Sequence, residues 1–229
     1  MSQPLVSVLF VSYNRPFYLE RAVKSVRKYF PGNVEYEIVI TDDGSNTETV
    51  KRIYALNPDK TILSLSNEGA GANSNKGLRK CQGEYVLYMQ DDCVAHAPFT
   101  ESLTRGLDLL QKTPNIDIFR FLVPFAETMH SFASSRVVET GKEMWEVVEL
   151  CPPKEEFMYV YSDLPHLRRR SFPDKFGYYP EGLSLVETEN YYVCEFIKKR
   201  GIASWSSDVD VVKSMSHIGS ISTNQKKED

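Results

Sequence analysis

The sequence predicts an α/β fold with a mostly parallel central sheet and helices on both of its faces. Three observations lead to this prediction. The first half of the chain alternates short apolar runs with amphipathic stretches, which is the pattern of strands joined by crossover helices. The apolar runs are continuous, as in strands that are buried on both faces. Polar clusters follow the runs directly, at the edge where sheets of this kind bind ligands.

The first strand and the first helix have the clearest signals. Val6 to Val11 (VSVLFV) is β-branched, aliphatic or aromatic at nearly every position and ends at the turn sequence SYNRP. From Phe17 to Tyr29 the apolar residues fall on one helical face, while Glu20 and Lys24 lie away from it. The sequence PGN then ends this helix.

The next three strands repeat this alternation. EIVIT runs into the turn sequence DDGS, TILSL into a loop rich in glycine and alanine, and EYVLYM into Gln90, Asp91 and Asp92. Helices are expected between them, from Thr47 to Leu56 and from Ala72 to Lys80. Because the carboxyl ends of parallel strands meet at one edge of a sheet, four polar clusters are expected to converge there.

The second half of the chain has a weaker pattern. We expect helices at 101–111 and 187–199, strands at 116–123, 157–161 and 209–212, and a hairpin within 136–150. The segment from Leu167 to Tyr179 is basic, aromatic and rich in turn residues. Since no repeat or linker divides the chain, we expect one domain over residues 1–219 and a polar tail over 220–229.

Composition and charge restrict the class of protein. The 229 residues are 41% hydrophobic and 25% charged, which is ordinary for a globular domain, and the net charge of -4 disfavours a nucleic-acid partner. No apolar run approaches the roughly 20 residues that cross a bilayer, and the N-terminus lacks a signal-peptide pattern. The 4 cysteines form no CxxC pair, which favours reduced thiols. We therefore expect a cytoplasmic protein.

Asp91 and Asp92 are the first candidate site. Adjacent carboxylates at a sheet edge are costly unless they are solvated, paired or bound to a cation. Mg²⁺ and Mn²⁺ prefer oxygen ligands and often join carboxylates to a diphosphate. A solvated turn is the alternative interpretation, for this pair and for residues 42–45. The segment 67–71 could let backbone amides approach a phosphate, although it lacks the GK[ST] of a P-loop.

The clusters are more specific when they are taken together. In chain order they read VSVLFVSYNRP, EIVITDDGS, NEGAGANSNKG and GEYVLYMQDD. This series resembles the family-2 glycosyltransferases, which have the GT-A (nucleotide-diphospho-sugar transferase) fold. LRRRSFPDKFGYYPEG and ETENYYVCEFIKKRG are similar to later motifs of the family. The resemblance implies one GT-A domain, with residues 1–95 as its nucleotide-binding half and 96–219 as its acceptor-binding half.

The resemblance also implies an activity and its partners. The reaction would be a metal-dependent, inverting transfer of a sugar from a nucleotide-diphosphate sugar, with UDP as the expected nucleotide. The acceptor would be a hydroxyl of a glycan or of a lipid-linked sugar. The basic stretch near Arg168 would allow peripheral contact with anionic lipid at the inner face of a membrane.

The resemblance further implies which residues bind the nucleotide sugar. Asp43 would hydrogen-bond the base, Val11 to Asn14 would border it, and the arginines after Leu167 would hold the diphosphate or an anionic acceptor. The family's usual Ala-Arg pair is replaced here by Asn73 and Ser74. The residues implied for donor binding are Val11, Tyr13, Asn14, Arg15, Asp43, Ser45, Asn67, Gly69, Asn75, Asp91, Arg168 and Arg169.

Two residues are implied as metal ligands, with Mn²⁺ or Mg²⁺ as the cofactor. Asp92 is the last acid of the family's Asp-x-Asp motif, in which Gln90 replaces the first acid. His217 corresponds to a late histidine that similar enzymes use as a second ligand. By itself, a histidine in this position is as well explained as an ordinary surface or core residue.

The resemblance places the catalytic base at the start of the acidic helix. Inverting transfer needs a carboxylate that takes the proton of the acceptor hydroxyl. The family's Glu-Asp pair aligns with Glu189 and Asn190, so Glu189 is the first candidate and Glu187 the second. Acids at the start of a helix are also favoured by the helix dipole without any catalytic role.

Two alternatives remain open from the sequence. Gln90 and Asn190 replace acids of the family pattern, which is consistent with a catalytically inactive nucleotide-sugar-binding or scaffold protein. A nucleotidyltransferase on a related fold would carry a glycine-rich, basic loop after the first strand. The loop SYNRPF disfavours that class.

Overall fold

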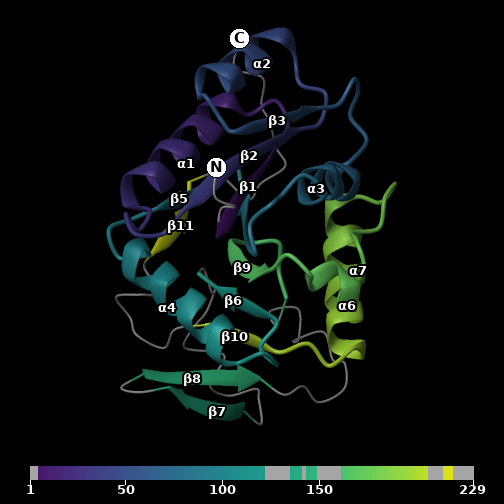
Figure 1. Ribbon diagram of the computed structural model, residues 1–229. Coiled ribbons are helices and arrows are strands. Elements are labelled where there is room, and N and C mark those ends of the chain that lie inside the picture. The colour runs from purple at the N-terminus through teal and green to yellow at the C-terminus, as the bar shows by residue number, and fades with distance from the viewer. Residues whose placement is uncertain (1–4, 122–134, 141–142, 149–160, 206–213, 219–229) are drawn as a thin grey trace.

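In the computed structural model, the described residues are 5–121, 135–140, 143–148, 161–205 and 214–218. Seven strands form the main sheet, in the order β10-β6-β9-β4-β1-β2-β3 (Figure 1). Their bounds are β1 Val6–Ser12, β2 Tyr36–Asp42, β3 Lys60–Leu63, β4 Tyr85–Gln90, β6 Ile118–Arg120, β9 His166–Arg169 and β10 Ala203–Trp205. Only β9 is antiparallel to its neighbours among these described strands, so the predicted mostly parallel sheet is confirmed.

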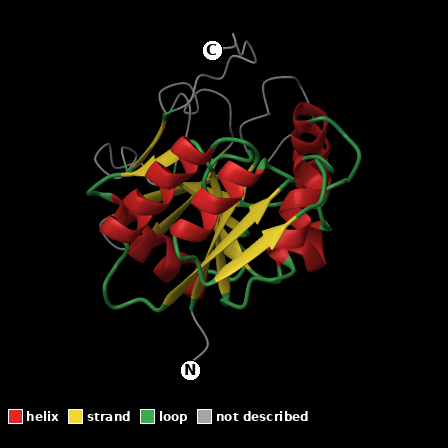
Figure 2. Cartoon of the chain, turned by 90° about the horizontal axis from the view of Figure 1, so that it is seen from above, coloured by secondary structure: helices red, strands yellow, loops and turns green. Residues whose placement is uncertain are grey.

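Helices cover both faces of this sheet (Figure 2). They are α1 Pro16–Tyr29, α2 Thr47–Ala55, α3 Ala70–Leu78, α4 Phe99–Lys112, α6 Phe172–Phe176 and α7 Leu185–Lys198. One core cluster joins α1, α2 and α4 to Val8 and Phe10 of β1. A second joins α3, α6 and α7 to Leu9 of the same strand. Because successive side chains of a strand point to opposite faces, the continuous apolar run of β1 follows from burial on both faces.

Two small sheets complete the described chain. β5 (Cys93–Ala95) follows β4 almost directly and pairs antiparallel with β11 (Met215–His217), which brings a late segment to the carboxyl edge of the main sheet. β7 (Ser135–Thr140) and β8 (Glu143–Val148) form the hairpin that was expected within residues 136–150. None of the helices in the described ranges is long and apolar enough to cross a membrane.

The turn-rich structure expected from Leu167 to Tyr179 is wrong for the first residues of that segment. β9 lies inside the sheet, between β4 and β6. Arg168 of β9 is buried, with its guanidinium carbon 4.7 Å from the ring centre of Phe172 and 5.6 Å from that of Tyr179. Ring faces attract a cation, and this attraction allows a basic residue to occupy a central strand.

Other expected elements differ in length or cannot be compared. The strand expected at 116–123 is present as β6 over three residues, and residues 122–123 lie outside the described ranges. The strand expected at 209–212, most of the one at 157–161 and the tail at 220–229 also lie outside them.

Candidate functional site

The loops after β1, β2 and β4 are joined to one another at the carboxyl edge of the sheet. The main-chain N–H of Asn14 donates to Ser45 Oγ at 2.7 Å, and Asn14 Oδ1 accepts the N–H of Asn46 at 3.0 Å. Ser12 Oγ donates to Asp91 Oδ2 at 3.3 Å. The predicted convergence of polar clusters at this edge is therefore confirmed for these loops.

Asp43 fixes the loop between β3 and α3 to the same edge. Its buried carboxylate accepts the N–H of Glu68 through Oδ1 at 3.0 Å and the N–H of Gly69 through Oδ2 at 2.9 Å. Asn67 Oδ1 also accepts the N–H of Gly69, at 3.0 Å. Gly69 has a φ of 92°, which glycine adopts without strain. One carboxylate thus holds the turn that brings Asn67 and Gly69 near the end of β2.

Arg15 bridges the two adjacent aspartates. Its Nη1 lies 2.9 Å from Asp91 Oδ1 and 2.8 Å from Asp92 Oδ2, and both aspartates are 5% exposed. Burial raises the pKa of Asp91 to about 7, against the opposing effect of Arg15, and the charge of Asp92 raises it further. Although burial alone would lower the pKa of Arg15, the two carboxylates raise it. The two buried carboxylates are therefore stable in their charged form only with a positive charge beside them, and Arg15 supplies one.

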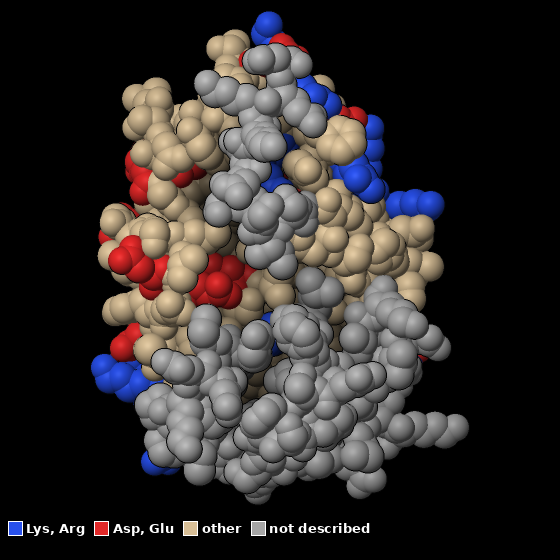
Figure 3. Space-filling view, turned by 180° about the vertical axis from the view of Figure 1, so that it is seen from behind, with Lys and Arg blue, Asp and Glu red and all other residues tan. Residues whose placement is uncertain are grey.

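The acidic residues are unevenly spread over the face that Figure 3 draws. Figure 3 shows a group of Asp and Glu side chains near the centre of the face that it draws, while most of the Lys and Arg side chains on that face lie elsewhere. A negative region of this kind attracts cations.

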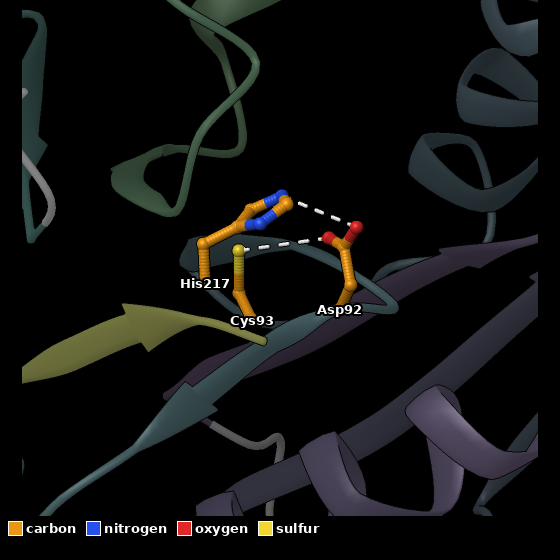
Figure 4. A group of neighbouring side chains, drawn as sticks. All are labelled: Asp92, Cys93 and His217. Atoms are coloured by element: carbon orange, nitrogen blue, oxygen red, sulfur yellow. Dashed lines mark hydrogen bonds and ion pairs between the residues drawn. The ribbon is translucent and has the colours of Figure 1, made fainter. Parts of the chain in front are cut away.

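Asp92, Cys93 and His217 form a group that could hold a metal ion (Figure 4). His217 Nε2 lies 3.1 Å from Asp92 Oδ2, and Cys93 Sγ lies 3.9 Å from Asp92 Oδ1. The N–H of Ile218 donates to the carbonyl of Asp92 at 2.8 Å, which fixes β11 beside the acid. The structure thus brings together the two expected ligands. Cys93 was missed in the sequence, where a cysteine outside a CxxC pair carries no metal signal.

A second pair of carboxylates comes from Asp163 and Glu189. The N–H of Asp163 donates to Glu189 Oε1 at 3.1 Å, and Tyr161 Oη donates to Asp163 Oδ1 at 3.4 Å. β9 pairs with β4 so that His166 lies opposite Tyr88. Burial raises the pKa of Tyr88, and the charges of Asp163 and Glu189 raise it further, so this carboxylate pair lies near β4. Sequence analysis missed Asp163, because an acid before Leu-Pro is indistinguishable from a turn residue.

The second carboxylate pair makes folding stability depend on pH. Burial raises the pKa of Asp163 to about 7, the charge of Glu189 adds to this, and Arg168 opposes it. An unfolded aspartate has a pKa of about 3.9, so the wild-type protein should lose stability as the pH rises from about 4 to about 7. At roughly 1.4 kcal/mol per pKa unit, the loss is a few kcal/mol.

We expect Asp163→Asn to remove this loss. Urea unfolding at several pH values should find the variant more stable than the wild type at pH 8 and equal to it at pH 4. Asp174→Asn, in an exposed aspartate, is the matched control and should give parallel curves. A stability difference for Asp163→Asn that does not change with pH would contradict the assignment.

The two candidate bases have different surroundings. Glu187 forms a capping box with Ser184, whose Oγ donates to Glu187 Oε2 at 2.6 Å, and these hydrogen bonds lower the pKa of Glu187. Its role at the start of α7 is therefore structural. Glu189, two residues further along α7, is partly buried and accepts the N–H of Asp163.

The structure does not bring Asn75, Arg168 and Arg169 to this edge. Asn75 is buried, and its amide bonds to the main chain of Tyr179 and to Glu181. Arg168 lies among the aromatic rings described above, while Arg169 donates to main-chain carbonyls that include that of Ile116, at 2.6 Å. Asn75 and Arg169 thus have polar partners within the fold, while the Arg168 guanidinium is buried against rings, with no hydrogen-bond partner for its Nη1 and Nη2 among the described residues. We therefore leave the three residues out of the site. The lipid contact expected near Arg168 consequently has no support.

Val11 and Tyr13 lie at the end of β1 and just after it. Val11 is the next-to-last residue of β1 and is partly exposed. Tyr13 follows the strand, and 42% of it is exposed. Both therefore lie beside the loops that Asn14 and Asp43 hold together.

The family model described as Glycosyl transferase family 2 matches residues 7–172. Over 94 residues, the chain is 32% identical to a GalNAc(5)-diNAcBac-PP-undecaprenol beta-1,3-glucosyltransferase of Campylobacter jejuni. This match covers 39% of the chain and 30% of that enzyme. The matched residues include the loops after β1, β2 and β4, whereas Glu189 and His217 lie beyond the family match.

Solved structures show the same fold. TarS of S. aureus, in complex with UDP-GlcNAc, has a TM-score of 0.64 and 22% identity, over 89% of this chain and 56% of that one. Mannosyltransferase PcManGT of Pyrobaculum calidifontis, with GDP-Man and Mn²⁺, has a TM-score of 0.62 and 12% identity, over 90% of this chain and 57% of that one. The chain therefore spans less than two thirds of each of these relatives.

Proposed function

Since the chain belongs to glycosyl transferase family 2, we propose that it moves a sugar from a nucleotide-diphosphate sugar to a hydroxyl of a glycan or lipid-linked acceptor. The donor is a UDP-sugar, the transfer inverts the sugar carbon, and Mn²⁺ or Mg²⁺ is the cofactor. The observation that carries this proposal is the meeting of Asp91, Asp92 and His217 at the carboxyl edge of the sheet. The complexes of TarS with UDP-GlcNAc and of PcManGT with GDP-Man and Mn²⁺ support it.

The loops at the ends of β1, β2 and β3 bind the nucleotide. Asp43 reads the base with the acceptor positions that its two N–H partners leave free, since each carboxylate oxygen accepts more than one hydrogen bond. Asp91 and Arg15 face the sugar and the diphosphate. The remaining residues of this proposed pocket are Val11, Tyr13, Asn14, Ser45, Asn67 and Gly69.

Asp92 and His217 hold the divalent cation. A carboxylate oxygen and an imidazole nitrogen 3.1 Å apart fit two neighbouring positions around one ion. A cation bound there would neutralise the diphosphate that leaves. Arg15, which already lies against Asp91 and Asp92, adds a second positive charge at the same place.

Glu189 takes the proton of the acceptor hydroxyl. Its Oε1 is oriented by the N–H of Asp163, whereas Glu187 is engaged in its cap and is the second candidate. Asn190 cannot take a proton, so the base is not at the position where the family has an aspartate. If neither of these glutamates nor the neighbouring Asp163 serves, the protein is an inactive nucleotide-sugar binder.

A binding and turnover experiment tests this proposal. UDP-, GDP- and dTDP-sugars are added with and without Mn²⁺, and thermal unfolding and donor hydrolysis are measured. At a hundredfold excess over Kd, a UDP-sugar with Mn²⁺ should raise Tm by roughly 5–10 °C. Hydrolysis of the donor should accompany binding. Tight binding without turnover of any donor would favour the inactive binder, and the absence of binding would contradict both functions.

A further inference from the structure

Cys93 lies on the same side of the small sheet as His217. It is the first residue of β5, directly after Asp92, and the register of β5 and β11 places His217 opposite it. Side chains of directly opposed residues in an antiparallel pair point to the same face, with Cβ atoms about 4.5–5.5 Å apart. Figure 4 shows the sulfur beside the imidazole, and dashed lines join each of them to the carboxylate of Asp92. The pairing of β5 with β11 therefore brings Cys93 and His217 together.

The spacing of the three groups suits coordination of one ion. The sulfur lies 3.9 Å from Asp92 Oδ1 and the imidazole nitrogen 3.1 Å from Oδ2, and all three ligand atoms lie within 4.8 Å of one another. Bonds of about 2.3 Å to sulfur and about 2.0–2.2 Å to nitrogen or oxygen place tetrahedral ligands roughly 3.3–3.6 Å apart. Shifts of about an ångström would bring the three atoms onto one ion.

The surroundings leave the sulfur available for this role. Cys93 is buried and forms no disulfide. The acceptors that the described residues offer to its S–H group are Gln90 Oε1 and Asp92 Oδ1, both at the long distance of 3.9 Å. Gln90 stands where the motif has its first acid, so a negatively charged ligand is missing there. A thiolate at Cys93 would supply that charge from three positions further along the chain.

We propose that Cys93 Sγ is a third protein ligand of the cation held by Asp92 and His217. The proposal rests on the metal site of the proposed function and changes the class of ion that fits it. Sulfur binds borderline-soft ions such as Zn²⁺, Co²⁺ and Cd²⁺, whereas Mg²⁺ takes oxygen ligands. On binding, a sulfur–metal bond replaces the S–H bond, and the proton passes to solvent. The site therefore prefers a thiophilic divalent ion over Mg²⁺.

Absorption spectroscopy of the metal-free full chain tests this proposal. Titration with Co²⁺ or Cd²⁺ should produce a thiolate-to-metal charge-transfer band that saturates at one equivalent. Cys93→Ser should abolish the band and weaken Cd²⁺ binding about tenfold or more, with Mg²⁺ binding unchanged. Cys81→Ser, in another buried free thiol, and Cys194→Ser, in an exposed one, are matched controls and should keep the band. Cys151→Ser covers the cysteine outside the described residues.

A measurement on the wild type makes the test independent of how the variants fold. X-ray absorption of the Zn²⁺-loaded protein should find a sulfur neighbour at about 2.3 Å. A band that survives Cys93→Ser, equal Cd²⁺ affinity in both proteins, or a zinc ion without a sulfur neighbour would overturn the proposal. Failure of UDP to bind with any cation would count against the proposed function. The charge-transfer band and the sulfur neighbour of zinc do not depend on UDP, so they would still decide whether Cys93 is a ligand.

Discussion

Asp92→Asn should lower sugar transfer by about 10³-fold and should remove the effect of Mn²⁺ on UDP binding. Asp92 contacts His217 and Arg15 and lies at the centre of the candidate metal group. An amide oxygen is a neutral, weaker ligand, so the diphosphate would lose the charge compensation that a bound cation supplies. A loss of 10³ corresponds to about 4 kcal/mol of the barrier. Transfer and UDP affinity are measured at increasing Mn²⁺ concentration.

Gln90→Ala is the matched control for that variant. It changes the neighbouring position of the same motif, which lacks the first acid, and should alter transfer and metal dependence only a few fold. If Asp92→Asn still binds UDP in a metal-dependent way, Asp92 is not a metal ligand. Equal losses in both variants would indicate that the loop, rather than one ligand, had been damaged.

The first half of the fold could be predicted because its signals are local. β1, β2 and β4 each contain one apolar run followed by polar turn residues, and two core clusters explain why Val8, Leu9 and Phe10 of β1 are apolar in succession. β9 could not be predicted in this way. Its arginines are compatible with a central strand only because aromatic rings from α6 and the following loop surround Arg168, and these contacts exist only in the folded chain.

A site residue could be predicted where it directly follows a predicted strand. It could not be predicted where its neighbour comes from a segment far away in the sequence. Asp43, Asp91 and Asp92 follow their strands directly. Cys93 gains its neighbour only from the pairing of β5 with β11, and Asp163 gains its neighbour from α7. Asn75 is the opposite case, since it fits a family pattern in the sequence, yet its amide holds the Tyr179–Glu181 turn.

Glu189→Gln should lower transfer by about 10²–10⁴-fold, the usual contribution of general base catalysis, and should leave UDP affinity within twofold. The amide oxygen of glutamine can still accept the N–H of Asp163, so the local structure should persist. The variant therefore removes proton acceptance and little else. Single-turnover transfer and UDP binding are measured on the same preparation.

Glu187→Gln separates the helix cap from the chemistry. Glu187 accepts from the backbone N–H and from the hydroxyl of Ser184, and a glutamine at this position also closes a capping box, so the variant should keep its helix cap and a turnover near that of the wild type. Turnover lost in Glu187→Gln and kept in Glu189→Gln would transfer the role of base to Glu187. Turnover kept in both variants would assign the role of base to Asp163, which forms a carboxylate pair with Glu189. Because the pKa of Asp163 is raised to about 7, the transfer rate would then rise with pH across neutrality.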